Sequence, residues 1–262
     1  MKAEDAAGRI AGALWDAEAR QWAQKPDADF NADPLFQLMR SRGVLNSEAS
    51  VLDVGCGSGR YSVVFALHAA SVVGCDASKE MIEAARSRAR SRGCTNARFE
   101  AATWREFSSS ERFDVVVAHR TAAISTLEDI DKMTRLCRGR CFYTVFLERT
   151  NPVVQAASLA AGLTAKPDYA RHAAGVVAHL IKSGLCPLLS YEKIENVRRL
   201  AAKEAVSWCH NRIKLRVHPR TLAPSALAAA ENAVCGFARG GQVEMPQRAL
   251  LVTIDWSAAG VI

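Results

Sequence analysis

The segment VLDVGCGSGRYS places three glycines, Gly55, Gly57 and Gly59, directly after a short apolar run at 51–54. Such a run is typical of a strand buried on both faces of a parallel sheet. Glycines permit a tight turn and close approach of the backbone to a ligand, and a following helix N-terminus favours polar groups. The segment therefore predicts a strand, a cofactor-binding loop and a helix. A glycine loop alone is weak support, because glycines also end strands for structural reasons.

Strands and helices alternate along the chain after this loop. The apolar patterns predict strands at 51–55, 71–76, 97–102, 113–119 and 140–147, separated by helices ending at 70 and spanning 78–92 and 126–137. Further strands are expected at 188–197 and 248–256, with helices at 151–163, 168–183, 201–215 and 223–238. This rhythm predicts an α/β fold with a doubly wound, mostly parallel sheet and helices on both faces.

Two helices are expected before the first strand. Small and aromatic side chains recur at helical spacing over 5–24, and Asp33 followed by Pro34 marks the start of a second helix. We therefore divide the chain into an N-terminal helical cap (1–44), a cofactor-binding core (45–150) and a completion of the sheet (151–262). The last part contains a helical insertion, 198–247, before the final strand. A substrate lid and fixed packing are both open interpretations of it.

Charge and cysteine content indicate which cellular compartment and which kinds of ligand suit this chain. The chain has a formal net charge of +7 and eight cysteines, scattered without CxxC pairs or zinc-ligand spacing. Acidic residues near the start argue against a signal peptide, and no apolar run is long enough to span a bilayer. These features predict a cytoplasmic protein with reduced thiols, no membrane segment and no bound metal.

An acidic residue at the end of the second expected strand strengthens the cofactor interpretation. Asp76 ends that strand in VVGCDAS, 17 positions after Gly59. A carboxylate at this position can accept hydrogen bonds from both hydroxyls of a ribose. The alternative is that Asp76 only caps the helix that follows.

These segments resemble the class I, Rossmann-like S-adenosylmethionine-dependent methyltransferases: VLDVGCGSG their first motif and CDAS their second. The resemblance covers roughly residues 48–147. It implies a seven-stranded sheet whose antiparallel last strand, here 248–256, lies between the fifth and sixth strands. It also implies S-adenosyl-L-methionine as cofactor, S-adenosyl-L-homocysteine as product, and direct in-line methyl transfer.

The same resemblance implies which residues contact the cofactor. Asp53 is expected to help hold its methionine end, Gly55 and Gly57 to pass under it, and Asp76 to hold the ribose. The contacts expected in full are Asp53, Gly55, Cys56, Gly57, Asp76, Ala77, Thr103, Trp104 and Ala118.

The third motif departs from the family pattern. Many relatives carry an aspartate for the adenine amino group where this chain has Thr103, followed by Trp104. The Thr103 hydroxyl, the Trp104 backbone N–H and the indole are the groups that would face the adenine instead. A buried packing role for Trp104 is the alternative.

The fourth motif, FDVVVAHRTA, supplies the catalytic candidates His119 and Arg120. Both follow the fourth expected strand, at the sheet edge where ligands bind in open α/β folds. His119 is a candidate general base, because histidine titrates near neutrality, with substrate orientation or packing as alternatives. The segment lacks the (D/N)PP(Y/F) signature of amino-group nucleic-acid methyltransferases and the Pro-Cys nucleophile of cytosine C5 enzymes.

These features favour a small-molecule methyl acceptor for a monomer or homodimer. Two other functions stay open. RSRARSR at 86–92 concentrates positive charge and is compatible with an RNA-modifying methyltransferase, although no aromatic residues interleave to stack bases. A cofactor-binding protein without transferase activity is the second, because the adenine aspartate and a decisive catalytic residue are missing.

Overall fold

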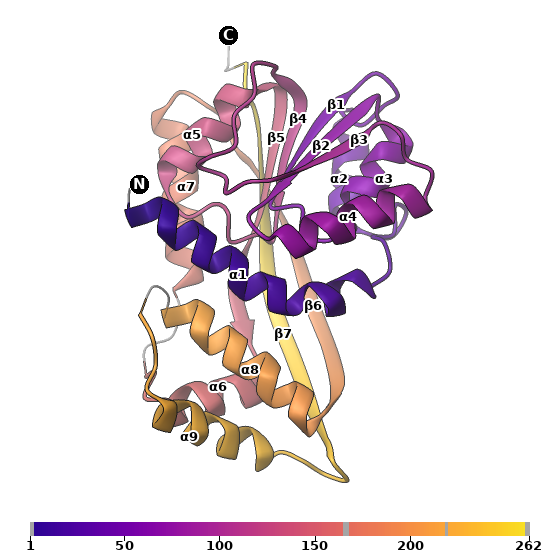
Figure 1. The fold of residues 1–262 in the computed structure, drawn as a ribbon. Coiled ribbons are helices and arrows are strands. Elements are labelled where there is room, and N and C mark those ends of the chain that lie inside the picture. The colour runs from indigo at the N-terminus through magenta and orange to yellow at the C-terminus, as the bar shows by residue number, and fades with distance from the viewer. Residues whose placement is uncertain (1–2, 165–167, 218–219, 260–262) are drawn as a thin grey trace. The chain divides into compact units, whose positions relative to one another are not determined.

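The computed structural model describes residues 3–164, 168–217 and 220–259, and its ribbon is shown in Figure 1. The chain forms two compact units, each built from separate segments. The first comprises the described residues up to Val145, then Arg171–Glu192 and the described residues from Val252. The second comprises Phe146–Ala170 and Lys193–Leu251, as far as they are described.

Within these described ranges, seven strands form one sheet in the order β3-β2-β1-β4-β5-β7-β6. The strands are β1 (Ser50–Val54), β2 (Ser71–Asp76), β3 (Ala97–Ala101), β4 (Phe113–His119), β5 (Cys137–Thr150), β6 (Leu188–Ala201) and β7 (Gln242–Ser257). The helices are α1 (Ala3–Ala23), α2 (Pro34–Ser41), α3 (Ser62–His68), α4 (Lys79–Ser91), α5 (Leu127–Leu136), α6 (Pro152–Ala160), α7 (Tyr169–Lys182), α8 (Ala202–Val217) and α9 (Pro224–Cys235). The predicted fold class is confirmed, including the place of β7 between β5 and β6.

Parallel pairing aligns the carboxyl ends of the central strands. Asp53 of β1 lies opposite Gly74 of β2 and Val117 of β4. Asp76 and His119, the last residues of β2 and β4, therefore extend beyond the same edge of the sheet as the loop after β1. This edge brings the first, second and fourth sequence motifs together.

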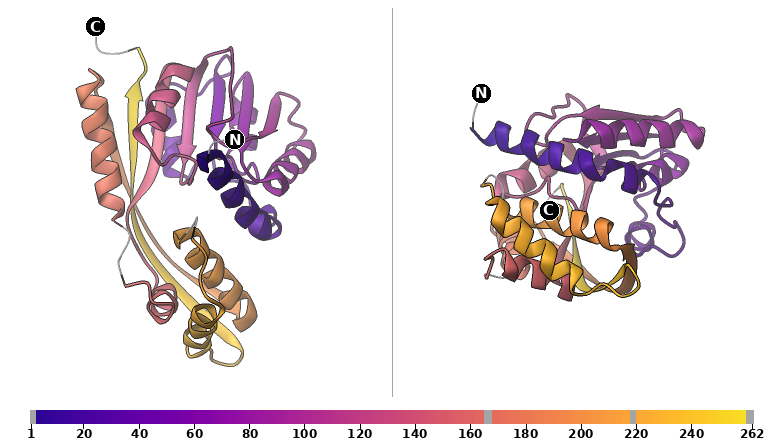
Figure 2. Two further views of the ribbon diagram at one scale, coloured as in Figure 1. Left: turned by 60° about the vertical axis from the view of Figure 1, so that its left-hand side comes forward. Right: turned by 60° about the horizontal axis from the view of Figure 1, so that its bottom comes forward.

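Helices cover both faces of this sheet in the first unit. On one face, α2, α3 and α4 pack on the strands through a core that includes Phe36, Phe65 and Phe142, all fully buried. The next residue of β5, Tyr143, points to the other face, where its hydroxyl lies 2.9 Å from His172 Nε2 of α7. The turned view in Figure 2 shows α7 on the side of the sheet away from α4.

A buried carboxylate joins three elements of the first unit. Asp255 of β7 is fully buried and accepts hydrogen bonds from Arg42 Nε (3.0 Å), just after α2, and from Arg140 Nε of β5 (2.6 Å). Two guanidinium groups thus neutralise one buried charge, which is the condition under which burial of an ion is tolerated.

The second unit is a helical cluster on extensions of the long strands. α6, α8 and α9 pack together around Trp208, Ile213 and Val234, with Met245 from β7 in the same core. Figure 2 shows α8 and α9 side by side in both views. This unit contains most of the insertion predicted before the final strand.

The last three strands are longer than the sequence predicts, and each contributes residues to both units. The division into a cap, a core and a completion of the sheet stays a prediction. β7 begins at Gln242 rather than 248, although Pro246 argues against a strand. Its burial alternates, with Val243 and Met245 inside and Glu244 exposed, as in a strand covered on one face. No helix in the described ranges combines the length and apolarity needed to cross a bilayer.

Candidate functional site

The glycine loop after β1 is held against the end of β2. The backbone N–H groups of Gly55 and Cys56 both donate to the Cys75 carbonyl, at 2.8 and 3.1 Å, and Gly59 N donates to the Cys56 carbonyl at 3.1 Å. Gly55, Gly57 and Gly59 all have positive φ values, +66°, +53° and +75°. The loop conformation therefore favours glycine at all three positions.

The three glycines differ in what surrounds them. A Cβ at Gly55 would lie 1.9 Å from Thr121 Oγ1, and one at Gly59 would lie 2.9 Å from Ala85 Cβ. A Cβ at Gly57 would meet no described atom within 4 Å. Gly55 and Gly59 are thus needed for packing, whereas Gly57 borders open space that a ligand can occupy.

Asp76 joins the loop to the start of α4. One carboxylate oxygen accepts the Gly57 N–H at 2.9 Å, and the other accepts the Ser78 N–H at 2.9 Å. Burial raises the pKa of Asp76, although these two hydrogen bonds act to lower it. Ser78, not Asp76, is the N-cap of α4, since its hydroxyl accepts from Met81 N. Each Asp76 oxygen keeps acceptor capacity for a ribose hydroxyl, so the residues fit the cofactor implied by the sequence.

Asp53 lies beneath the loop. It is buried, and one of its oxygens accepts a hydrogen bond from the Ser62 hydroxyl at 2.6 Å. Burial raises the pKa of Asp53 to about 7, the Ser62 bond lowers it, and the nearby Asp76 raises it. Burial also raises the pKa of Cys56 well above its usual range, which keeps this thiol protonated. The role of Asp53 toward the methionine end stays a prediction.

Thr103 and Trp104 are used in packing. The Thr103 hydroxyl donates to Glu106 Oε2 at 2.9 Å and accepts from Glu106 N at 3.2 Å, and these bonds close a local turn. Trp104 is buried, stacks on Phe107, and has Lys132 Nζ 4.4 Å from its ring centroid. These contacts correspond to the packing alternative for Trp104, and a role toward adenine stays a prediction for both residues.

His119 is the most distinctive polar group at the end of β4, directly after the fully buried Ala118. Both ring nitrogens are shielded from solvent and have no hydrogen-bond partner among the described residues. Burial, with Arg120 and Arg60 nearby, lowers the pKa of His119 well below its usual range. The ring packs against Tyr61, with centroids 4.5 Å apart. His119 is therefore a neutral imidazole, and each of its two ring nitrogens is able to form a hydrogen bond with a bound ligand.

Arg120 follows in an unusual backbone conformation. It has a φ of +55° and is the single non-glycine residue with positive φ in the part of the chain that the structure describes. Its N–H donates to the Thr144 carbonyl of β5 at 2.9 Å, which fixes this turn. Such strain costs on the order of 1–3 kcal/mol and concentrates at functional sites.

Sequence reasoning missed Tyr61, whose ring packs against His119, and the acidic residues near Tyr61 and Arg120. The Tyr61 hydroxyl donates to Asp33 Oδ2 at 2.7 Å, while Asp33 Oδ1 accepts Leu35 N as the cap of α2. Glu192 of β6 is half-buried, which raises its pKa, and its charge interacts with Arg120 and Asp33. Nothing in the sequence relates these residues, because they come together from distant segments of the first unit.

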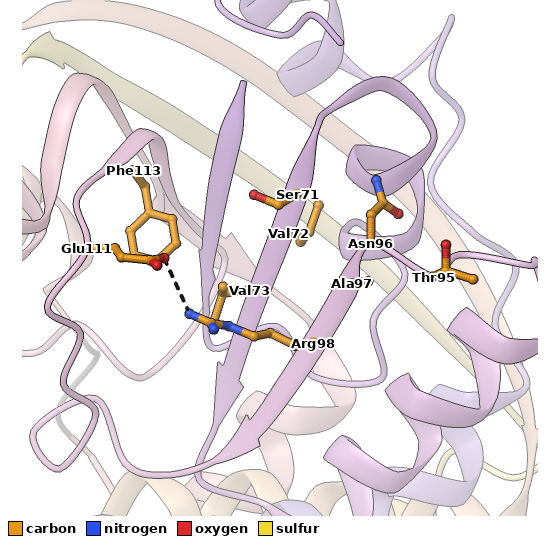
Figure 3. A pocket seen from close by; sticks show the side chains of 9 residues that line it. All are labelled: Ser71, Val72, Val73, Thr95, Asn96, Ala97, Arg98, Glu111 and Phe113. Carbon is orange, nitrogen blue, oxygen red and sulfur yellow. Dashed lines mark ion pairs between the residues drawn. The ribbon is translucent and has the colours of Figure 1, made fainter. Parts of the chain in front are cut away.

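A shallow pocket lies at the opposite edge of the sheet (Figure 3). It is lined by Ser71, Val72, Val73, Thr95, Asn96, Ala97, Arg98, Glu111 and Phe113. Arg98 and Glu111 approach within 3.8 Å there, and both side chains are largely exposed. These residues lie at the amino ends of β2, β3 and β4, whereas ligands of open α/β sheets bind at the carboxyl ends. The candidate site is therefore the edge formed by Gly57, Asp76 and His119.

The family model that matches this chain and two of its relatives are described as methyltransferases. A family model described as a methyltransferase domain matches residues 45–203. The uncharacterized methyltransferase YcgJ of Bacillus subtilis is 33% identical over 86 residues, 32% of this chain and 34% of YcgJ. The 23S rRNA (uracil(1939)-C(5))-methyltransferase RlmD of a Marinomonas species is 34% identical over 89 residues, 32% of this chain and 20% of RlmD. The chain thus covers only about a third or less of the length of these two relatives.

Solved structures share the fold. The crystal structure of YcgJ from Bacillus subtilis superposes with a TM-score of 0.55 at 18% identity, covering 83% of this chain and 96% of YcgJ. The cyclase SpnF superposes with a TM-score of 0.53 at 19% identity, covering 93% of this chain and 96% of SpnF. Since one of these is a cyclase, the shared fold does not determine the reaction.

Proposed function

Because the chain belongs to the methyltransferase domain family and is an S-adenosylmethionine-dependent methyltransferase, we propose that its methyl acceptor is a small molecule. The observation that carries this proposal is His119, whose two shielded ring nitrogens have no partner among the described residues. A buried polar group without a partner costs about 1–3 kcal/mol. An acceptor bearing a hydroxyl or N–H group would supply that partner.

The cofactor supplies a methyl group on an activated sulfonium, so the protein has to position the acceptor and exclude water. We assign the cofactor side to Gly57, where the loop borders open space, and to Asp76, which keeps free acceptor capacity. We assign the acceptor side to His119 and Arg120. A lowered pKa makes His119 a poor base, so it acts as a neutral hydrogen-bond partner that orients the acceptor.

RNA is the second candidate acceptor, favoured by the local similarity to RlmD. Three of the four arginines in 86–92 argue against it, whereas Arg90 is exposed. Arg86 is bonded to Glu83 and to the Phe99 carbonyl, and Arg88 and Arg92 both pair with Asp27. Arginines engaged within the chain are less available to phosphates, and the small-molecule proposal is therefore preferred.

Transfer of label from methyl-labelled S-adenosylmethionine tests the proposal. Two fractions of a cell extract are offered separately: metabolites freed of macromolecules by ultrafiltration, and total RNA. We expect label in the metabolite fraction with the parent protein and much less with His119→Ala. Label in RNA alone would overturn the small-molecule acceptor while leaving the transferase activity standing.

The same proposal includes a cytoplasmic location. All eight cysteines are free thiols, and four of them, Cys75, Cys137, Cys141 and Cys209, are buried. Unpaired thiols persist in reducing compartments. Fractionation of cells that express the protein, followed by immunodetection, tests this location.

A further inference from the structure

Arg88, in the last turns of α4, bridges the glycine loop and the end of α1. Its Nε donates to the Ser58 carbonyl at 2.9 Å, inside the loop. Its Nη2 donates to the carbonyls of Ala23 and Lys25, both at 2.9 Å. The Arg88 side chain is only 11% exposed. One guanidinium thus joins a loop peptide to carbonyls at the C-terminal end of α1, where helix carbonyls lack intrahelical partners and a cation is favourable.

A carboxylate fixes the orientation of this guanidinium. Asp27 Oδ1 accepts from Arg88 Nη1 at 2.5 Å, and Asp27 Oδ2 pairs with Arg92, one turn further along. The Asp27 side chain is 13% exposed, so the Arg88 pair is largely shielded from solvent. Charge-assisted hydrogen bonds of this kind are stronger than neutral ones, and the planar guanidinium fixes several directions at once.

The last residues of α1 and the segment after it make further contacts with the glycine loop. The Ser58 hydroxyl donates to the Trp22 carbonyl at 3.1 Å. Arg60 Nε donates to the Pro26 carbonyl, and Ala28 N donates to the Arg60 carbonyl at 3.2 Å. We call residues 22–28 the strap, because they are hydrogen-bonded to loop residues 58–60.

The described half of α1 is also attached at the start of α4. Asp16 Oδ1 accepts from the Ser78 hydroxyl and, at 3.2 Å, from Glu80 N. A Cβ at Gly12 would lie 2.6 Å from the carbonyl oxygen of Ala77, so the helix approaches this peptide closely. α1 therefore runs beside α4 (Figure 1), attached at both ends of it.

We propose that Arg88 is a positioning residue for S-adenosylmethionine: it holds the glycine loop in its binding conformation by joining the Ser58 peptide to the strap. Ser58 lies between Gly57 and Gly59, which both have positive φ and few intrinsic restraints. The Arg88 hydrogen bond to the Ser58 carbonyl restrains the backbone between these two glycines. The inference rests on the cofactor site alone and is independent of the acceptor.

Two variants of Arg88 and one matched control test this role. Arg88→Ala removes the bridge, Arg88→Lys keeps the charge but loses the planar fork, and Arg90→Ala removes an exposed arginine of the same helix. Affinity for S-adenosylhomocysteine is measured by calorimetry. Chymotryptic cleavage after Trp22, without ligand, reports how firmly the strap is attached, and thermal unfolding reports folding.

We expect Arg88→Ala to bind S-adenosylhomocysteine about tenfold more weakly and to be cleaved faster, with Arg88→Lys between it and the parent. Arg90→Ala should match the parent in both measurements. Parent-like affinity in folded Arg88→Ala, or an equal loss in Arg90→Ala, would overturn the proposal. If Arg88→Ala does not fold, parent-like affinity in Arg88→Lys overturns it. Absence of binding by the parent would instead refute the cofactor site, and cleavage would still report on the strap.

Discussion

The backbone N–H of Gly57 donates to a carboxylate oxygen of Asp76 at 2.9 Å, so the residue assigned to the ribose also holds the glycine loop. The carboxylate and the loop are therefore placed relative to each other before any ligand arrives. Such preorganisation reduces the ordering cost of binding.

Asp76→Ala should weaken binding of both S-adenosylmethionine and S-adenosylhomocysteine by about 1–3 kcal/mol, because the ribose loses charge-assisted hydrogen bonds and the loop loses its anchor. Calorimetry measures the change. Ser78→Ala is the control, since it removes the cap of α4 and leaves the carboxylate in place. Equal affinity in parent and Asp76→Ala would refute the ribose assignment.

Gly57→Ala and Gly43→Ala form a matched pair. Both glycines have positive φ, +53° and +65°, and at neither would a Cβ meet a described atom within 4 Å. Each substitution should cost roughly 1–2 kcal/mol of stability through backbone strain. Only Gly57→Ala should also lose affinity for S-adenosylhomocysteine, as measured by calorimetry. The same affinity in both variants would show that the space beside Gly57 is not part of the cofactor site.

His119→Asn should leave S-adenosylhomocysteine affinity within a few-fold of the parent and slow methyl transfer on the order of 10²-fold. The lowered pKa also predicts the pH dependence: His119 stays neutral across the physiological range, so the parent rate should show no step from this residue near neutrality. The pH profile of kcat/KM checks this. A step near neutrality that disappears in His119→Asn would restore the general-base role.

Asp53 should make the protein less stable as the pH rises. Burial raises its folded-state pKa from 3.8 to about 7, so the folded protein holds a proton that the unfolded chain releases. Its contribution is fully present below the unfolded pKa and is lost as the pH rises through the folded pKa, by up to about 1.4 kcal/mol per pH unit. Asp53→Asn has no carboxyl group at this position, so this pH-dependent contribution to its stability is absent.

Denaturant unfolding of parent and Asp53→Asn between about pH 4 and about pH 8 measures the difference. The parent should lose stability relative to the variant across this window. A difference that does not change with pH would mean that the carboxyl is ionised in the folded protein.

Arg42→Ala should lower the free energy of unfolding by about 1–3 kcal/mol, because the buried Asp255 carboxylate would lose one of its two guanidinium partners. Arg40→Ala, a nearby exposed arginine, should change it by less than about 0.5 kcal/mol. Chemical denaturation compares the two. If the two variants changed the free energy of unfolding equally, Arg140 alone would be sufficient to neutralise the Asp255 carboxylate.

The sequence predicted the features that depend on local pattern. The apolar runs located the strands, and Asp33 with Pro34 located the start of α2, because capping and burial on both faces leave local signals. It left Asp76 open between ribose binding and helix capping. The structure identifies Ser78 as the cap, a choice between neighbours that pattern alone does not make.

The surroundings of His119 could not be predicted in the same way. Tyr61, Asp33 and Glu192 lie on three separate segments, and only the fold brings these polar groups near one another. Arg88 was part of an arginine-rich stretch whose positive charge was compatible with an RNA contact. Its side chain is instead buried against the loop and the strap, because Asp27 lies far away in sequence but close in space.

The ion pair between Arg42 and Asp255 joins residues separated by 213 positions. During synthesis, Arg42 and Arg140 leave the ribosome long before the carboxylate that neutralises them, and β7 enters the sheet only after the second unit has been translated. Contacts this distant in sequence slow folding, because a long loop must close before they contribute. The sheet that supports the glycine loop is therefore completed by its last strand, after nearly the whole chain has emerged.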